Sequence, residues 1–402
     1  MVSQSAESDI RPPLPPSQSP PSRRARNLRL GVYLVCVALC LAAGTKARLH
    51  HIDSFPRPNQ TADEFAWTWA GITMLTEGAP RSWSWLDAYG DFPVITWRGA
   101  PFRLVTPWLD HPPLFALLQG TWMVLRGYRD IEHVDLTVMR EMSVLLFMLA
   151  YLVLWRVART LLDRLGAVIT LLIYATSSTV VMNSRLVISE NLVTPLLLLG
   201  HLALLRWDVS RKARWMLVMG LCAFLMPLTK LPAVCTCFAL AAIAWHLKAV
   251  RAAVVISVGT VSGTAGFYVY GKLLGGDLFM KVMDSHKDKF QGFHGFLKFF
   301  FETAVVNVGV AHLPFFLAFA LAAHALLKQR PDGTTHAAIA VIAYPLSMTF
   351  LVVQAQVYGW YLLPLYPYLA ILLGAFWASL LRGQNSAGLW IAIGLMVPQL
   401  AN

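Results

Sequence analysis

The chain is dominated by apolar runs that are long enough to cross a membrane. Of its 402 residues, 57% are hydrophobic and only 13% are charged, and its mean hydropathy is +0.56. Soluble globular domains carry about 25% charged residues, whereas a membrane-spanning helix needs about 20 predominantly apolar residues. The sequence therefore predicts an all-α polytopic membrane protein, and the first question is how many spans it has.

Eleven segments have adequate apolar length. We predict spans at 28–48, 140–160, 166–182, 187–206, 214–229, 231–247, 252–273, 302–327, 334–353, 357–381 and 386–400. The segment 112–126 differs from these, because its apolar stretch is only about fourteen residues long, a length typical of interfacial or re-entrant helices.

Basic residues decide whether 112–126 crosses the membrane. They occupy the short connections in small groups: Arg156, Arg159 and Arg164; Arg206, Arg211, Lys212 and Arg214; Lys248 and Arg251; Lys328 and Arg330; and Arg382. If 112–126 does not cross, all these groups lie on the side of the basic N-terminus, as the positive-inside rule requires. We therefore expect a cytoplasmic N-terminus and an external C-terminus. Scattered loop charges also explain the net charge of +12 without a nucleic-acid-binding face.

The predicted organisation has three parts. Residues 1–27, which are rich in Pro and Ser and then basic, form a disordered cytoplasmic tail. Residues 28–381 form one membrane module, in which the loops 49–139 and 274–301 are external, and 382–402 contain the terminal span. The long first loop is expected to carry interfacial helices.

The first loop also holds the adjacent carboxylates Asp63 and Glu64, at the start of a helical pattern over 62–76. Acidic residues stabilise the positive end of a helix, which is a common surface role. A carboxylate at the membrane surface can instead accept a proton from an attacking hydroxyl. His111 also has a structural and a functional interpretation. It precedes two prolines, which initiate helices, but a histidine at this position can also bind a phosphate or an acceptor.

Three ionisable residues stand between apolar runs with little connecting loop. Arg185 and Glu190 occur in SRLVISEN, and Lys230 occurs in PLTKLP. Ionisable groups at such depth are rare and indicate function, with Arg185 and Glu190 pairing across a bend as the structural alternative. Lys230 is either a snorkelling lysine or a point charge for a lipid-linked phosphate.

Two further groups of residues are candidates for binding. Gln354 and Tyr361 precede or begin a predicted span, where aromatic residues are common and an amide can face sugar hydroxyls. His50, His51 and Asp53 are weak candidates for a divalent metal site, as are His286 and His294, since their spacing matches no standard ligand pattern. No cofactor is required by these patterns, and a divalent metal stays open.

The order of these motifs resembles that of the integral-membrane GT-C glycosyltransferases. DEFAWTWAGITMLTEGAPRSW follows the first span, and HPPLFALLQG, SRLVISENLVTPLLLL, PLTKLPA and YGWYLLPLYPYLAI come after it in the same order as in that family. The resemblance is to the dolichyl-phosphate-mannose protein mannosyltransferases and the aminoarabinose lipid A transferases. It covers about residues 28 to 381.

The resemblance implies transfer of a sugar, with inversion, from a polyprenyl phosphate to an acceptor hydroxyl on the external or lumenal face. By position, Asp63 is the general base, while Arg185 and Lys230 neutralise the leaving phosphate, where charge develops in the transition state. The residues assigned to the substrate pocket are Glu64, His111, Glu190, Gln354 and Tyr361.

The expected partners are a polyprenyl-phosphate sugar, membrane lipid, and an acceptor that is a lipid, a protein or a cell-wall glycan. We expect the protein in a bacterial inner membrane, with no nucleic-acid partner. A transporter or flippase of a lipid-linked substrate is the alternative class, but the sequence has no internal repeat, which many transporters have. An inactive relative that only binds a lipid-linked sugar is a third interpretation.

Overall fold

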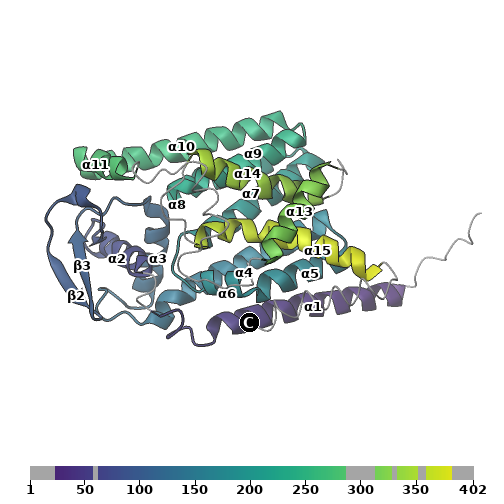
Figure 1. Ribbon diagram of the computed structural model, residues 1–402, viewed down its shortest axis with the longest axis horizontal. Helices are drawn as coiled ribbons and strands as arrows, with labels where there is room; N and C mark the ends of the chain where they lie inside the picture. The colour runs from purple at the N-terminus through teal and green to yellow at the C-terminus, as the bar shows by residue number, and fades with distance from the viewer. Residues whose placement is uncertain (1–22, 58–61, 287–312, 328–332, 352–358, 383–402) are drawn as a thin grey trace, which may run out of the picture.

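A computed structural model describes residues 23–57, 62–286, 313–327, 333–351 and 359–382. Helices form most of it (Figure 1). The α-helices are α1 (Arg23–Leu49), α2 (Asp63–Thr76), α3 (Pro113–Leu125), α4 (Leu136–Leu161), α5 (Arg164–Thr176), α6 (Ser178–Asn183), α7 (Glu190–Ser210), α8 (Ala213–Thr229), α9 (Val234–His246), α10 (Val250–Gly275), α11 (Asp277–Ser285), α13 (Leu313–Leu327), α14 (Thr334–Leu351) and α15 (Tyr366–Arg382). The 3-10 helices are η2 (Asp87–Tyr89), η3 (Leu231–Ala233) and η6 (Gly359–Leu365), and the strands are β1 (Ser82–Trp83), β2 (Val94–Trp97) and β3 (Ala100–Val105).

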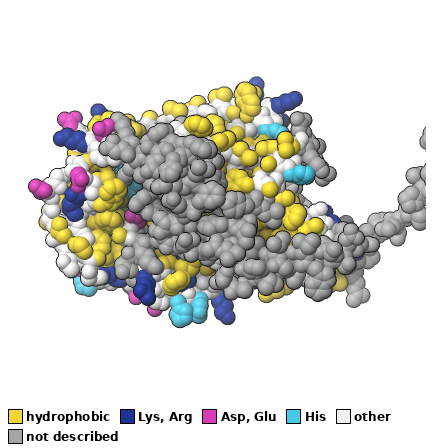
Figure 2. Space-filling model, viewed as in Figure 1, with side chains coloured by type: hydrophobic (Ala, Val, Ile, Leu, Met, Phe, Trp, Pro, Cys, Tyr) yellow, Lys and Arg dark blue, Asp and Glu magenta, His cyan; other side chains and the backbone are white. Residues whose placement is uncertain are grey.

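The long helices form a bundle, and α2, α3 and the strands lie together at one end of it (Figure 1). The helix α1 begins at the opposite end. On the face drawn in Figure 2, acidic side chains gather at the end that carries the strands, together with some Lys and Arg, whereas the other end shows Lys, Arg and His side chains. On this face, the acidic side chains are therefore concentrated at the end that carries the strands. We call the end that carries the strands the polar end.

The helices α1 and α4 run antiparallel along their length. Near the end of α1, the Arg140 side chain in the second turn of α4 donates to the carbonyl oxygen of Ile52 (2.8 Å). Further along α4, the Tyr151 hydroxyl donates to the carbonyl oxygen of Val37 (2.8 Å). The chain between α1 and α4 thus leaves and re-enters the bundle at the same end. The intervening chain, which includes the short helix α3, therefore makes no net traverse of the bundle.

In the part of the chain that the structure describes, five helical segments are long and apolar enough to span a membrane: Asn27–Leu49, Leu136–Leu161, Glu190–Ser210, Val250–Gly275 and Trp360–Arg382. The other predicted spans correspond to shorter helices or to helices interrupted by a bend, such as α5 and α6, which Ser177 separates. The predicted span at 386–400 lies outside the described residues. The count of eleven spans thus stays a prediction, while the polytopic helical architecture is confirmed.

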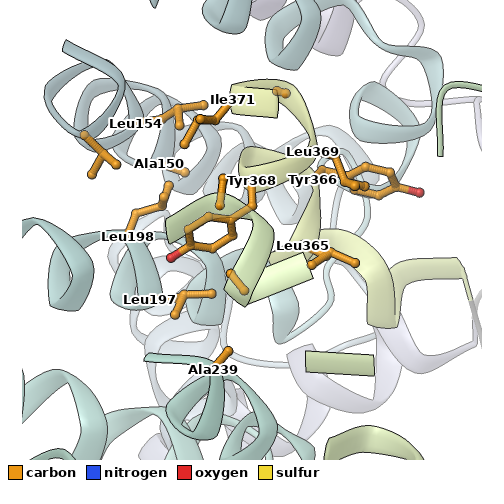
Figure 3. Close-up of a cluster of buried hydrophobic side chains, with 14 of the residues drawn as sticks. Ala150, Leu154, Leu197, Leu198, Ala239, Leu365, Tyr366, Tyr368, Leu369 and Ile371 are labelled. Carbon is orange, nitrogen blue, oxygen red and sulfur yellow. The ribbon is translucent and has the colours of Figure 1, made fainter. Parts of the chain in front are cut away.

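Burial inside the protein varies strongly between these spans. In the most apolar window of Trp360–Arg382, 83% of the residues are buried, against 22% in the windows of Asn27–Leu49 and Val250–Gly275. The central position of α15 is visible in Figure 3, where its Tyr368 and Ile371 lie among Leu154 of α4 and Leu198 of α7. The exposed apolar faces of α1 and α10 are suited to contact lipid.

The polar end contains a small antiparallel sheet of order β1-β3-β2, which corrects the all-α prediction. Trp97 pairs with Ala100 across a two-residue turn, and both turn residues, Arg98 and Gly99, have positive φ (49° and 77°). Such turns match the twist of a hairpin. The sheet packs on α2 through aromatic contacts, including Phe65 against Trp97 (4.7 Å between ring centroids).

The helices α2 and α3 cross in direct backbone contact at two glycines. A Cβ atom added to Gly71 would lie 1.9 Å from the carbonyl oxygen of Ala116, and one added to Gly120 would lie 2.1 Å from the carbonyl carbon of Gly71. Only glycine fits at such a crossing. The contact fixes the helix that starts at Asp63 against the helix that follows His111.

Candidate active site

His111 lies against a tryptophan of the helix that begins at Asp63. Asp63 is half-buried at the first position of α2, and Trp67 lies on the same face, because residues four apart in a helix are neighbours. The Trp67 indole stacks on the His111 imidazole, with ring centroids 4.8 Å apart and planes inclined by 15°. Both residues singled out in the first loop therefore belong to one surface at the polar end of the bundle.

A second histidine approaches from a distant part of the chain. His286 follows α11 and stacks on His111 at 6.5 Å between centroids. The helix α11 folds back over the end of α10 because Gly271 leaves room for the Phe279 ring, which a Cβ atom would meet at 2.3 Å. Of the residues proposed for the second external loop, His286 is thus placed beside the first loop. His294 lies outside the described residues.

Asp110 is a carboxylate that the sequence analysis missed. Its two oxygens accept hydrogen bonds from the Ser84 hydroxyl (2.7 Å) and the Tyr89 hydroxyl (2.6 Å). The Leu109 amide in turn donates to the Tyr89 hydroxyl oxygen (2.7 Å). Burial and the neighbouring Asp110 raise the pKa of Tyr89, so that it stays a neutral donor. The sequence feature that could have identified Asp110 is its position directly before His111, in DHPP.

Glu64 has a different environment from its neighbour Asp63. Its side chain is fully buried and forms a two-pronged ion pair with Arg140, in which the Nε and Nη2 atoms donate at 2.9 Å and 2.7 Å. The Val187 amide also donates to Glu64 Oε1 (3.1 Å). The carboxylate proposed for the substrate pocket is therefore enclosed by protein groups.

Arg185 lies in the bend between α6 and α7, with 5% of its surface exposed. Its Nη2 atom donates to the carbonyl oxygen of His50, and its buried Nε atom has no hydrogen-bond partner within the described residues. Burial lowers the pKa of Arg185, as does the nearby Arg140. The alternative in which Arg185 pairs with Glu190 is wrong, since Glu190 pairs with another residue.

That residue is Lys230, whose ammonium group forms an ion pair with Glu190. Lys230 follows α8, and its Nζ atom lies 4.2 Å from the ring centroid of Tyr361 in η6. The carbonyl oxygen of Tyr361 accepts a hydrogen bond from Tyr344 (2.6 Å). Three of the predicted site residues therefore form one buried cluster, and Gln354 lies outside the described residues.

The metal candidates are not assembled. Within the described residues, no group of three or more His, Cys, Asp or Glu side chains is arranged to hold a metal ion. His50 and His51 are exposed, and their rings are tilted against one another with 4.1 Å between the centroids. The part of His50 that contacts the site is its backbone carbonyl, which Arg185 binds.

Comparison with known proteins agrees with this architecture. The model of the dolichyl-phosphate-mannose-protein mannosyltransferase family matches residues 110–267, and no curated protein matches the sequence. Among solved structures, ArnT from Cupriavidus metallidurans bound to undecaprenyl phosphate is similar with a TM-score of 0.59 and 17% identity, covering 91% of this chain and 63% of that one. The apo oligosaccharyltransferase of Archaeoglobus fulgidus gives a TM-score of 0.57 and 14% identity, covering 92% and 55%.

A third structure, AglB from Archaeoglobus fulgidus in complex with an inhibitory peptide and a dolichol-phosphate, has a TM-score of 0.56 and 13% identity, covering 93% of this chain and 55% of that one. The chain spans less than two thirds of the length of all three. The resemblance predicted from the motifs is confirmed: the chain has the fold of these integral-membrane glycosyltransferases, and its residues 110–267 match the mannosyltransferase family.

Proposed function

We propose that the protein is a membrane glycosyltransferase that moves a sugar from a polyprenyl phosphate to an acceptor hydroxyl. The observation that carries the proposal is the polar end of the bundle, where the half-buried Asp63 and the buried Arg185 lie on segments joined through Glu64. An accessible carboxylate and a buried cation are the two groups that such a transfer needs.

The step assigned to these residues balances in atoms and charge. The acceptor hydroxyl oxygen attacks the anomeric carbon from the side opposite the phosphate, and its proton passes to the Asp63 carboxylate. The bond between the anomeric carbon and the phosphate oxygen breaks, and the lipid phosphate leaves with the electron pair. Arg185 and Lys230 stabilise the negative charge that develops on it, and His111 lines the pocket.

Two findings support a lipid-linked donor. The similar structures include one bound to undecaprenyl phosphate and one with a dolichol-phosphate. The exposed apolar faces of the outer helices give such a lipid a direct approach to the polar end from the bilayer. The acceptor hydroxyl belongs to a lipid, a protein or a cell-wall glycan, and no metal is assigned a step.

The charge difference between the ends of the bundle supports an orientation in the membrane. The end where α1 begins shows Lys and Arg side chains with little acidic surface on the drawn face (Figure 2), and we assign it to the cytoplasm by the positive-inside rule. The polar end then faces outward from a bacterial inner membrane. The sugar is transferred on that external side.

Replacement of Asp63 tests the proposal. Asp63→Asn retains the shape of the side chain but cannot take up the proton, so transfer from a radiolabelled polyprenyl-phosphate sugar should fall by at least about 10²-fold. Asp91→Asn is the matched control, because Asp91 is an exposed carboxylate of the same polar end. Both variants should insert into membranes in unchanged amounts. Transfer by Asp63→Asn at the rate of the control would refute the assignment of the base.

A further inference from the structure

We propose that Glu64 and Arg140 are positioning residues, and that their buried ion pair fixes the distance between the base Asp63 and the phosphate-binding Arg185. This inference rests on the proposed function and deepens it. Neither side chain is exposed, with 0% of each accessible. They therefore act on the reaction through the groups that they hold and do not contact a substrate themselves.

Arg140 uses each of its guanidinium nitrogens in a separate contact. Nε and Nη2 bind the two oxygens of Glu64, Nη1 donates to the carbonyl oxygen of Ile52 (2.8 Å), and Nη2 also donates to that of Pro56 (2.9 Å). Arg140 thereby joins α4, the start of α2 and the segment that follows α1. A planar fork with fixed donor directions sets an orientation that a lysine cannot set.

Glu64 extends this link to the segment that carries Arg185. Its Oε1 atom accepts from the Val187 amide (3.1 Å), two residues beyond Arg185. Asp63 and Arg185 are thus each within one or two residues of the same carboxylate. A shift of that carboxylate moves both groups relative to one another.

The Arg185 segment is also held from its other sides. The carbonyl oxygen of Leu186 accepts from Ser143 (2.7 Å) and from Asn191 (2.7 Å). The hydroxyl of Ser184 accepts from Arg48 Nε (2.6 Å). Because its neighbours are fixed, the segment cannot adjust locally when Glu64 moves. A displacement of Glu64 therefore displaces Arg185 as well.

The energetic consequence is large because the pair is buried. Removing one partner leaves the other charge without compensation in a low-dielectric interior, so the remaining side chain will rearrange or recruit water. A misplacement of about 1 Å at a reacting group can reduce the rate by about 10²-fold. A small change at Glu64 should therefore affect the chemical step more strongly than its distance from the substrate suggests.

The test compares Glu64→Gln, Arg140→Gln and the double variant with the unmodified full-length protein. Thermal unfolding, undecaprenyl phosphate binding, kcat and KM are measured for each. The single variants should lose stability, bind undecaprenyl phosphate several-fold more weakly, and lose at least about tenfold in kcat. The double variant has no uncompensated charge and should regain stability, yet its kcat should stay low because the two amides do not reproduce the fork.

Three results would overturn the inference. In the first, Glu64→Gln turns over and binds lipid phosphate as the unmodified protein does. In the second, the double variant regains kcat together with stability, which would show that the pair only compensates two buried charges and does not position the site. In the third, Glu64→Gln shifts the pH dependence of kcat, which assigns the proton transfer to Glu64 itself.

Ser143→Ala covers the case in which the charge variants do not fold. It deletes one hydrogen bond to the Arg185 segment and leaves the ion pair intact, so a smaller loss of kcat and of lipid phosphate affinity is expected. An unchanged Ser143→Ala variant would contradict the rigid coupling. Failure of the proposed function would look different: the unmodified protein would neither bind undecaprenyl phosphate nor transfer a sugar.

Discussion

The glycine contact between α2 and α3 makes a sharp prediction about how the active site is assembled. In Gly71→Ala, the new Cβ atom would lie 1.9 Å from the carbonyl oxygen of Ala116 and 2.7 Å from the amide nitrogen of Gly120. Ordinary contact begins near 3.4 Å, so the helices must separate by about 1.5 Å. Because the opposing atoms belong to the backbone, no side-chain rotation can relieve the overlap.

Two opposing terms determine the expected magnitude. Overpacking a filled interior costs about 1–3 kcal/mol, and a backbone clash belongs at the upper end of that range. Alanine returns about 1 kcal/mol because it favours helix over glycine. We therefore expect a net loss of about 2 kcal/mol in the free energy of unfolding, or a fall of about 4 °C in the unfolding temperature.

The effect on transfer should exceed the effect on stability. Because α2 begins at Asp63 and α3 follows His111, a separation of the helices displaces the base from the pocket that His111 lines. A displacement of about 1 Å can cost about 10²-fold in rate. The assay is sugar transfer by protein that has been purified and shown to be folded, together with its thermal unfolding curve.

Gly31→Ala is the matched control. Gly31 lies in the helix α1 and has no atom within 4 Å of its added Cβ position. The same substitution should therefore leave transfer unchanged and raise stability slightly, by up to about 1 kcal/mol, because only the helix preference of alanine acts there. If Gly71→Ala behaves like Gly31→Ala in both measurements, the close crossing of α2 and α3 does not position the site, and the reasoning is wrong.

Three other perturbations give distinct outcomes. Lys230→Met should destabilise the protein by about 3–5 kcal/mol because Glu190 stays buried without its partner, and adding Glu190→Gln should restore much of the loss in thermal unfolding. Arg48→Lys should also lower the unfolding temperature, because a lysine cannot reach the three oxygen acceptors that the guanidinium binds. The hydrogen bond to Asp130 favours protonated His133 and raises its pKa, so Asp130→Asn should lower the pKa of His133 in an NMR titration.

The length of the apolar runs and the positions of the charges predicted the features that the membrane imposes on the chain. Apolar length located the helices of the bundle, and the basic connections predicted that 112–126 makes no net crossing, because each property is local in sequence. Asp63 and His111 were singled out for a related reason, since each stands at the start of a helix in a loop that is otherwise distinct. The stacking of His111 on Trp67 could not be predicted, because it depends on how α2 and α3 cross.

The missed features depend on pairs of residues far apart in the chain. Glu64 and Arg140 are separated by 76 positions, and no local pattern distinguishes the fully buried Glu64 from the half-buried Asp63 beside it. Arg140 stands at the start of a predicted span, where a basic residue at the end of a membrane helix is common. The sheet was missed for another reason: β1 and β2 are two and four residues long, too short for alternation to stand out within a loop rich in tryptophan.

The buried charges at the polar end indicate which of the two cations proposed for the donor phosphate, Arg185 or Lys230, contributes more to its binding. The buried basic side chains there are Arg48, Arg140, Arg185 and Lys230. Glu64 and Glu190 neutralise two of them, Arg140 and Lys230, whereas within the described residues no carboxylate lies within ion-pair distance of Arg185.

A buried cation without an ion-pair partner is costly. The more distant Asp53 offsets part of this cost, and a phosphate that arrives at Arg185 removes the rest. Its Nη2 atom must exchange only the neutral carbonyl oxygen of His50, and its Nε atom has no hydrogen bond within the described residues to give up. Lys230, in contrast, must share its charge with Glu190 before it can bind an anion. We therefore expect Arg185 to supply most of the affinity for the lipid phosphate, so that Arg185→Ala weakens undecaprenyl phosphate binding more than the neutral replacement of Lys230 and Glu190 together.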